Sequence, residues 1–92
     1  MHRGEPEPSV FVNRFSCGSE DSARALANAI IVEGLHPRVR PPRLPGERWL
    51  VHAAAQLVPT PENLVDLRRA MSDAAGRAGA TYEGCDSVSD PG

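Results

Sequence analysis

The chain has 92 residues, the size of one small domain, and its formal net charge of -2 argues against the sequence-independent phosphate binding that a basic domain would show. Apolar residues make up 40%, but only four residues are aromatic, so the composition predicts a thin core of alanine and aliphatic side chains. No apolar run approaches the roughly 20 residues of a membrane span, and the N-terminus lacks the apolar segment of a signal peptide. We therefore expect a cytoplasmic protein without a membrane contact.

The first third of the chain predicts a leader, a strand and a helix. Residues 1–9 are polar and proline-bearing, which is typical of a disordered leader. Residues 10–15 are rich in valine and phenylalanine and predict a strand. Ser19 can cap the helix that follows, and Gly34 can take the left-handed conformation that ends it, so the helix is expected over 19–33. Its apolar stripe at helical spacing consists of Ala23, Leu26, Ala27, Ile30 and Ile31.

The middle of the chain predicts two strands joined by a loop. Residues 35–41 alternate apolar with basic side chains, but they contain prolines, which cannot donate a ladder hydrogen bond and so place this strand at a sheet edge. Residues 42–47 carry proline and glycine and predict the loop. Residues 48–57 are free of proline and mostly apolar, as expected of a central strand, which Trp49 opens as a core residue.

The last third predicts a second helix and a short strand. Thr60 can cap this helix and Pro61 suits its first position, while Gly79 can close it. Residues 81–83 predict the final strand, and residues 86–92 a flexible tail, which leaves residues 10–85 as the folded domain. The apolar stripe of the helix consists of Leu64, Leu67, Met71, Ala74, Ala75 and Ala78.

This order of elements predicts a ferredoxin-like α+β fold, β-α-β-β-α-β, with a four-stranded antiparallel sheet of order 4-1-3-2 and both helices on one face. In that topology Cys17 and Cys85 follow the ends of neighbouring antiparallel strands and lie at opposite ends of the sheet, so we expect two free thiols. Neither cysteine has the spacing of a metal ligand, the histidines are scattered, and we expect no cofactor.

The face of the sheet that the helices leave open is the candidate binding surface. Alternation along the first strand allows two registers, one with Phe11 and Phe15 on the open face and one with both rings in the core, and it does not choose between them. In the first register, the candidate partner-binding residues are Phe11, Asn13, Phe15, Arg38, Arg40, Leu50 and His52.

The motifs of two functional classes that share this topology are missing. RNA-recognition domains stack bases on aromatic residues of the first and third strands, but residues 50–55 lack the aromatic-rich signature of that third strand, which disfavours direct RNA binding. No serine or cysteine has a histidine and acid pair beside it in the sequence, and residues 15–19 do not form the glycine-rich loop of acylphosphatases. We therefore expect a protein that is not an enzyme.

Several residues, taken in order, resemble one known family. A glycine closes the first helix, a tryptophan opens the third strand, a Pro-Thr turn leads into the second helix, and a Tyr-Glu-Gly segment follows near the end, at Gly34, Trp49, Pro59-Thr60 and Tyr82-Glu83-Gly84. Over about residues 10–84 the chain resembles the RraB family, small proteins that regulate or inhibit ribonuclease E. Cys85 stands where that family usually has tryptophan.

The resemblance implies a non-catalytic protein that binds a ribonuclease E-type nuclease or its scaffold and modulates RNA turnover by protein contact. A shared fold does not by itself transfer a partner. The alternative is a domain that senses a small ligand or forms a homodimer through the same open face.

Overall fold

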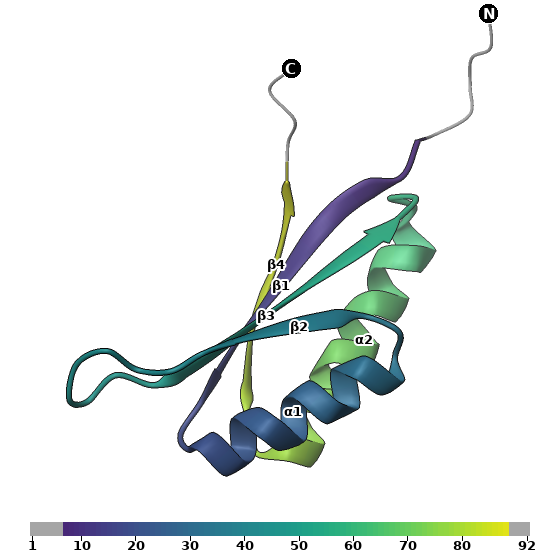
Figure 1. The fold of residues 1–92 in the computed structure, drawn as a ribbon. Helices are drawn as coiled ribbons and strands as arrows, with labels where there is room; N and C mark the ends of the chain where they lie inside the picture. The colour runs from purple at the N-terminus through teal and green to yellow at the C-terminus, as the bar shows by residue number, and fades with distance from the viewer. Residues whose placement is uncertain (1–6, 89–92) are drawn as a thin grey trace, which may run out of the picture.

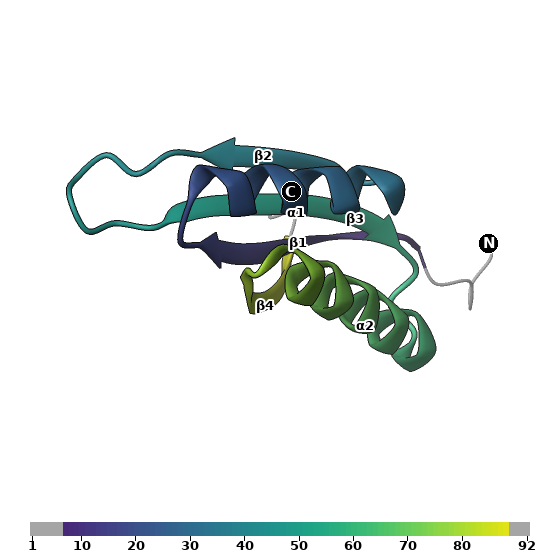
Figure 2. The same cartoon turned by 90° about the horizontal axis from the view of Figure 1, so that it is seen from below.

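A computed structural model describes residues 7–88 as four strands and two helices. The strands form one antiparallel sheet of order β2-β3-β1-β4, and both helices cover the same face of it (Figures 1 and 2). The predicted ferredoxin-like α+β fold is therefore confirmed, including the edge position of the proline-bearing strand. In chain order the elements are β1 (Ser9–Cys17), α1 (Glu20–Val32), β2 (His36–Arg40), β3 (Trp49–Leu57), α2 (Pro61–Ala78) and β4 (Thr81–Val88).

The helix ends follow the local signals of the sequence. The Ser19 side chain accepts a hydrogen bond from the backbone N-H of Ser22 at 3.1 Å, and Thr60 caps α2 in the same way through Asn63. Pro61 occupies the first turn of α2, where a missing N-H costs no hydrogen bond. Gly79 ends α2 with a φ of 69°, a left-handed conformation that glycine adopts without a Cβ clash.

Two strands are longer than predicted, and β1 is extended at both ends, from 10–15 to Ser9–Cys17. Ser9 belongs to β1 rather than to the leader, and β4 continues past Glu83 to Val88, so residues 86–88 lie in the sheet. The polar sequence of β4 has no strand alternation, but its backbone pairs with most of β1, from Val10 opposite Val88 to Ser16 opposite Thr81. The rest of the predicted leader and tail, residues 1–6 and 89–92, lies outside the described residues.

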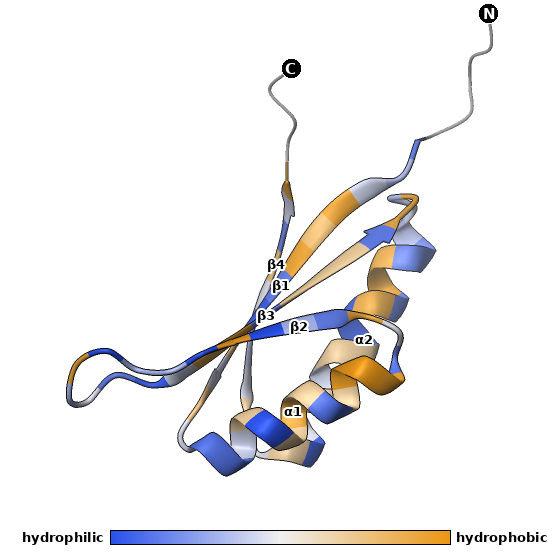
Figure 3. Cartoon of the chain, viewed as in Figure 1, coloured by the Kyte–Doolittle hydropathy of each residue, from blue (hydrophilic) through white to orange (hydrophobic). Residues whose placement is uncertain are grey.

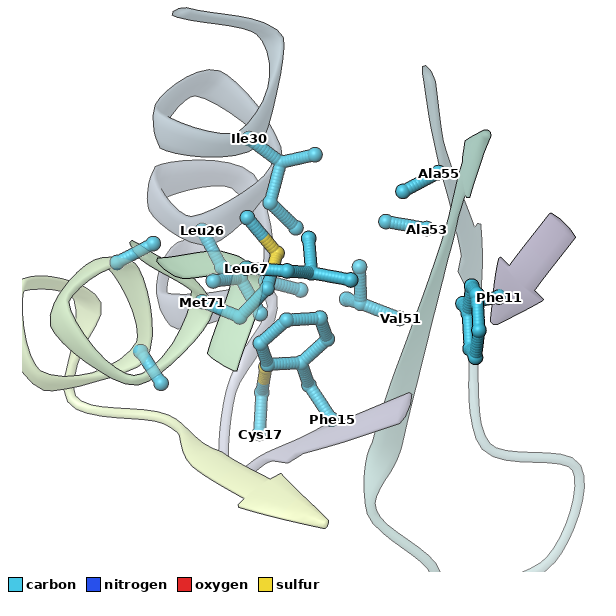
Figure 4. Packing of buried hydrophobic residues seen from close by; sticks show 13 residues of the cluster. Phe11, Phe15, Cys17, Leu26, Ile30, Val51, Ala53, Ala55, Leu67 and Met71 are labelled. Carbon is cyan, nitrogen blue, oxygen red and sulfur yellow. The ribbon is translucent and has the colours of Figure 1, made fainter. Parts of the chain in front are cut away.

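The core lies between the sheet and the helices and is thin, as the composition predicts (Figure 4). Its largest fully buried apolar side chains are Phe15, Leu26, Ile30, Met71 and Val51. Both predicted helical stripes face this core, except that Ile31 is exposed, and Trp49 packs at the edge of the core partly buried. Neither helix of the described residues has the length and hydropathy needed to cross a membrane.

Both cysteines are free, as predicted, but Cys85 is not at the end of its strand. It lies within β4 opposite Asn13, four residues along β1 from Cys17. At the usual rise of a strand this separates the two cysteines by about 13 Å. That distance is well beyond the reach of a disulfide.

Candidate functional site

The register of β1 decides which side chains lie on the open face. Phe11, Asn13 and Phe15 point toward the helices and are 8%, 0% and 0% exposed. Their assignment to the open face is therefore wrong, and the register with both rings in the core is the correct one. Opposite them on β3 lie Ala55, Ala53 and Val51, whose small side chains leave room for the rings beneath the helices.

Asn13 has a structural role that the alternation pattern did not indicate. Its Nδ2 donates a hydrogen bond to the Ala53 carbonyl of β3 at 3.1 Å, and its Oδ1 accepts one from the Tyr82 hydroxyl of β4 at 2.8 Å. The side chain thus joins three strands inside the core. Because both ends of the amide are paired, the buried polar group is not left with an unsatisfied donor or acceptor.

Tyr82 completes this cluster at the edge of the core. Its ring packs against Phe15 with the centroids 5.1 Å apart and the planes tilted by 36°. Burial, with a smaller contribution from the neighbouring Cys85, raises the pKa of Tyr82 to about 12. All four aromatic side chains of the protein therefore belong to the helix-covered side of the sheet or to its edge.

The other four predicted site residues come together on the open face. Arg38 lies opposite His52, and Arg40 lies opposite Leu50, in neighbouring rows of the β2 and β3 pair. The next strand extends the first row, because Arg14 of β1 also lies opposite His52. This row of Arg38, His52 and Arg14 crosses three strands. Arg14 was missing from the predicted site because that site was given for the register with Phe11 and Phe15 on the open face.

An apolar patch occupies the same face away from the loop between β2 and β3. Val10 pairs with Val88, and Val12 pairs with Ala54. Val10, Ala54 and Val88 are exposed, and Val12 is half-buried. We call these four residues the apolar patch. The core register of β1, once chosen, would have indicated Val10 and Val12, whereas nothing in the polar sequence of β4 indicated Val88.

Charge is divided across the open face. On the β4 side, Arg14 forms an ion pair with Asp86 at 3.0 Å. A bulge in β4 turns Glu83 toward Ser16, whose hydroxyl donates a hydrogen bond to its carboxylate at 2.8 Å. On the β2 side, neither Arg38 nor Arg40 has an ion-pair partner among the described residues. The face therefore presents uncompensated positive charge along β2 only.

The hollows on this face are shallow. One of about 220 Å³ lies between the apolar patch and the arginine row, lined by Val12, His36, Arg38, His52 and Ala54. It is smaller than the usual pocket for a small molecule. A second hollow on this face, of about 440 Å³, lies toward β4 and is lined by Arg14, Phe15, Ser16, Leu50, His52 and Glu83. A larger hollow, of about 670 Å³, lies on the helix side of the sheet, between α2, the end of β3 and the turn after α1. The open face thus presents a contact surface that includes one open hollow of small-molecule size.

The described residues show no assembled metal centre. Within residues 7–88, no group of three or more His, Cys, Asp or Glu side chains is placed to hold a metal ion. Cys17 is buried at the end of β1, and this burial raises the pKa of its thiol. A raised pKa keeps the thiol protonated and weakly nucleophilic.

The chain matches no protein-family model and no curated protein.

Proposed function

We propose that this protein is a non-catalytic regulatory domain that binds another protein through its open sheet face. The observation that carries the proposal is that an uncovered apolar patch lies on the same face as Arg38 and Arg40, which have no ion-pair partner among the described residues. The RraB resemblance names a ribonuclease E-type nuclease, or its scaffold, as the partner, so the expected outcome of binding is a change in RNA turnover.

The composition of the face supports a protein partner. Protein interfaces combine an apolar centre with a polar rim, and arginine is enriched at the positions that contribute most to binding energy. Here the apolar patch supplies the centre, and Arg38, Arg40 and His52 supply the polar side. An acidic or mixed surface that covers this face would both shield the apolar patch and pair the free guanidinium groups.

The same face lacks what base recognition requires. Recognition of single-stranded RNA on a sheet of this topology depends on aromatic rings that stack with bases. Phe11 and Phe15 lie in the core, and neither Trp49 nor Tyr82 belongs to the open face. The open face thus has no Phe, Tyr or Trp ring among the described residues and only the imidazole of His52, which favours a protein partner over RNA for this face.

The test is to replace Arg38 and Arg40 with alanine and to measure binding of a purified ribonuclease E-type nuclease, with and without its scaffold region, by surface plasmon resonance. Both arginines are exposed on an edge strand, so the fold should be retained. We expect binding at least about tenfold weaker, because loss of an arginine anchor typically costs more than about 1 kcal/mol.

The matched control is Arg69→Ala with Arg77→Ala, which removes the same charge from exposed positions of α2. This control should bind as the native protein does. Equal affinity of the native protein and the Arg38 and Arg40 double variant would refute the open face as the contact. If the native protein binds neither the nuclease nor its scaffold, the partner suggested by the resemblance is wrong.

Self-association is the second candidate, and the apolar patch favours it. Two copies could cover each other's patch and remove Val10, Val12 and Val88 from water. Light scattering after size exclusion would report a dimer, and Val12→Glu would convert it to a monomer by placing a charge at the centre of the contact. A native monomer at micromolar concentration would exclude this candidate.

A further inference from the structure

The β2 and β3 strands and the loop between them form a positively charged hairpin. Residues 36–57 contain four of the ten arginines and a single acid, Glu47, and so carry a formal charge of +3. Because the whole chain carries -2, the remaining residues carry -5. The loop extends away from the helices and from the rest of the sheet (Figures 1 and 2). We call this segment, residues 36–57, the basic hairpin.

The arginines of the basic hairpin are not neutralised. The ion pairs among residues 7–88 join Arg14 to Asp86 and Arg24 to Glu20, both outside the hairpin. The one acid of the hairpin is engaged with backbone instead. Its Oε1 accepts hydrogen bonds from the N-H groups of Arg43 at 2.9 Å and Leu44 at 3.3 Å.

These hydrogen bonds also hold the loop in shape. The N-H of Glu47 donates to the Leu44 carbonyl at 3.2 Å, so hydrogen bonds run in both directions between Leu44 and Glu47. Prolines at 41, 42 and 45 restrict the backbone further. A loop that is already restricted loses little conformational entropy when it binds.

The hairpin tip suits a polyanion better than a protein surface. Apart from its prolines, the loop over 41–48 has one apolar side chain, Leu44, and this loop is largely hydrophilic (Figure 3). The buried aromatic or aliphatic anchors that dominate protein interfaces are absent there. Guanidinium groups, in contrast, form paired hydrogen bonds with phosphate oxygens.

We propose that the basic hairpin binds the phosphate backbone of a nucleic acid strand, without reading its sequence. The net charge of -2 does not oppose this contact, because the opposite charges occupy different parts of the molecule. The acidic remainder repels a phosphate backbone and so restricts the contact to the hairpin. No aromatic ring lies on the hairpin tip to stack with a base, which leaves the backbone as the recognised group.

The experiment measures binding of the full chain to a fluorescently labelled oligouridine strand over a series of salt concentrations. Contacts from four arginines predict a slope of about -2.8 for the logarithm of the association constant against the logarithm of salt concentration. Replacing Arg43 and Arg48 with alanine should reduce this slope to about -1.4. The control Arg69→Ala with Arg77→Ala loses the same charge from α2 and should keep the native slope.

An oligodeoxythymidine strand should bind about equally, because the contacts are to phosphate. A preference of more than tenfold for either strand would overturn recognition of the backbone alone. Absence of strand binding at low salt, or equal loss of slope in both double variants, would overturn the proposal as a whole. If polyglutamate displaces the strand as effectively at equal charge, the hairpin is instead a site for acidic protein segments.

This proposal can fail independently of the nuclease contact. The variant with Arg43 and Arg48 replaced keeps Arg38 and Arg40, so it should bind the nuclease as the native protein does. Circular dichroism would confirm that the fold is unchanged, as expected for two exposed positions in the loop.

Discussion

The two faces of the sheet are built from the same strands and have opposite characters. Along β1, alternate residues place Phe11, Asn13 and Phe15 under the helices and Val12 and Arg14 on the open face. The covered face holds both phenylalanine rings and a fully paired amide, whereas the open face holds small apolar side chains and guanidinium groups. Residues that stabilise this domain and residues available to a partner are therefore separate sets, one residue apart in the sequence.

The largest expected effect comes from truncating a buried side chain on the covered face. Phe15→Ala removes a fully buried ring, and such substitutions typically cost about 3 to 5 kcal/mol. Since small domains are stable by about 5 to 15 kcal/mol, this is a large share of the total. Urea denaturation followed by tryptophan fluorescence would measure the loss in the free energy of unfolding.

Leu50→Ala is the matched change on the open face, one position from the Val51 partner of Phe15. Leu50 is 38% exposed, so its truncation should cost well under about 1 kcal/mol. Comparable losses for the two variants would mean that the open face is also part of the stabilising core, and the contrast between the faces would not hold.

A smaller effect is expected from the polar link inside the covered face. Asn13→Ala removes the partner of both the Ala53 carbonyl and the Tyr82 hydroxyl and should cost about 1 to 3 kcal/mol. Tyr82→Phe removes only the hydroxyl. Urea denaturation of both variants and of the double variant gives the coupling energy, and because the residues share a hydrogen bond, the double variant should lose less than the sum. Strict additivity would show that the hydrogen bond does not contribute.

The smallest expected effect is the pH dependence that Tyr82 gives to stability, because its hydroxyl is partly buried in the folded chain and exposed in the unfolded chain. The ordinary pKa of tyrosine is about 10, and burial raises that of Tyr82 to about 12. Between these values the unfolded chain ionises while the folded chain stays neutral, so the free energy of unfolding should fall as pH rises from about 10 to 12. Below that window this group should cause no change.

The protein has a single tyrosine, so tyrosinate absorbance reports Tyr82 directly. The midpoint should lie near 12 in the folded protein and near 10 in urea. Tyr82→Phe should abolish its share of the alkaline loss of stability. A folded-state midpoint near 10 would show that water reaches the hydroxyl freely.

Local chemistry determined much of the fold from the sequence alone. Ser19 and Thr60 offer a side-chain oxygen to the first free amides of a helix, and Gly79 supplies a left-handed residue at the end, so both helices were predicted to within a few residues. Pro37 within β2 and Pro41 just after it cannot donate ladder hydrogen bonds, which placed that strand at an edge. These signals depend only on neighbouring residues, and the order of elements then indicated the topology.

Only the tertiary structure decided which side of β1 faces the helices. A strand with valines and phenylalanines at alternating positions has two apolar faces, and burying the phenylalanine face under the helices removes the larger apolar area from water. The tertiary structure also decided the length of β4. Its polar residues join the sheet because the backbone N-H and C=O groups of β1 are available for pairing on that side. The separation of charge likewise depends on how the chain folds, because the projection of the loop is what isolates the basic hairpin from the acidic remainder.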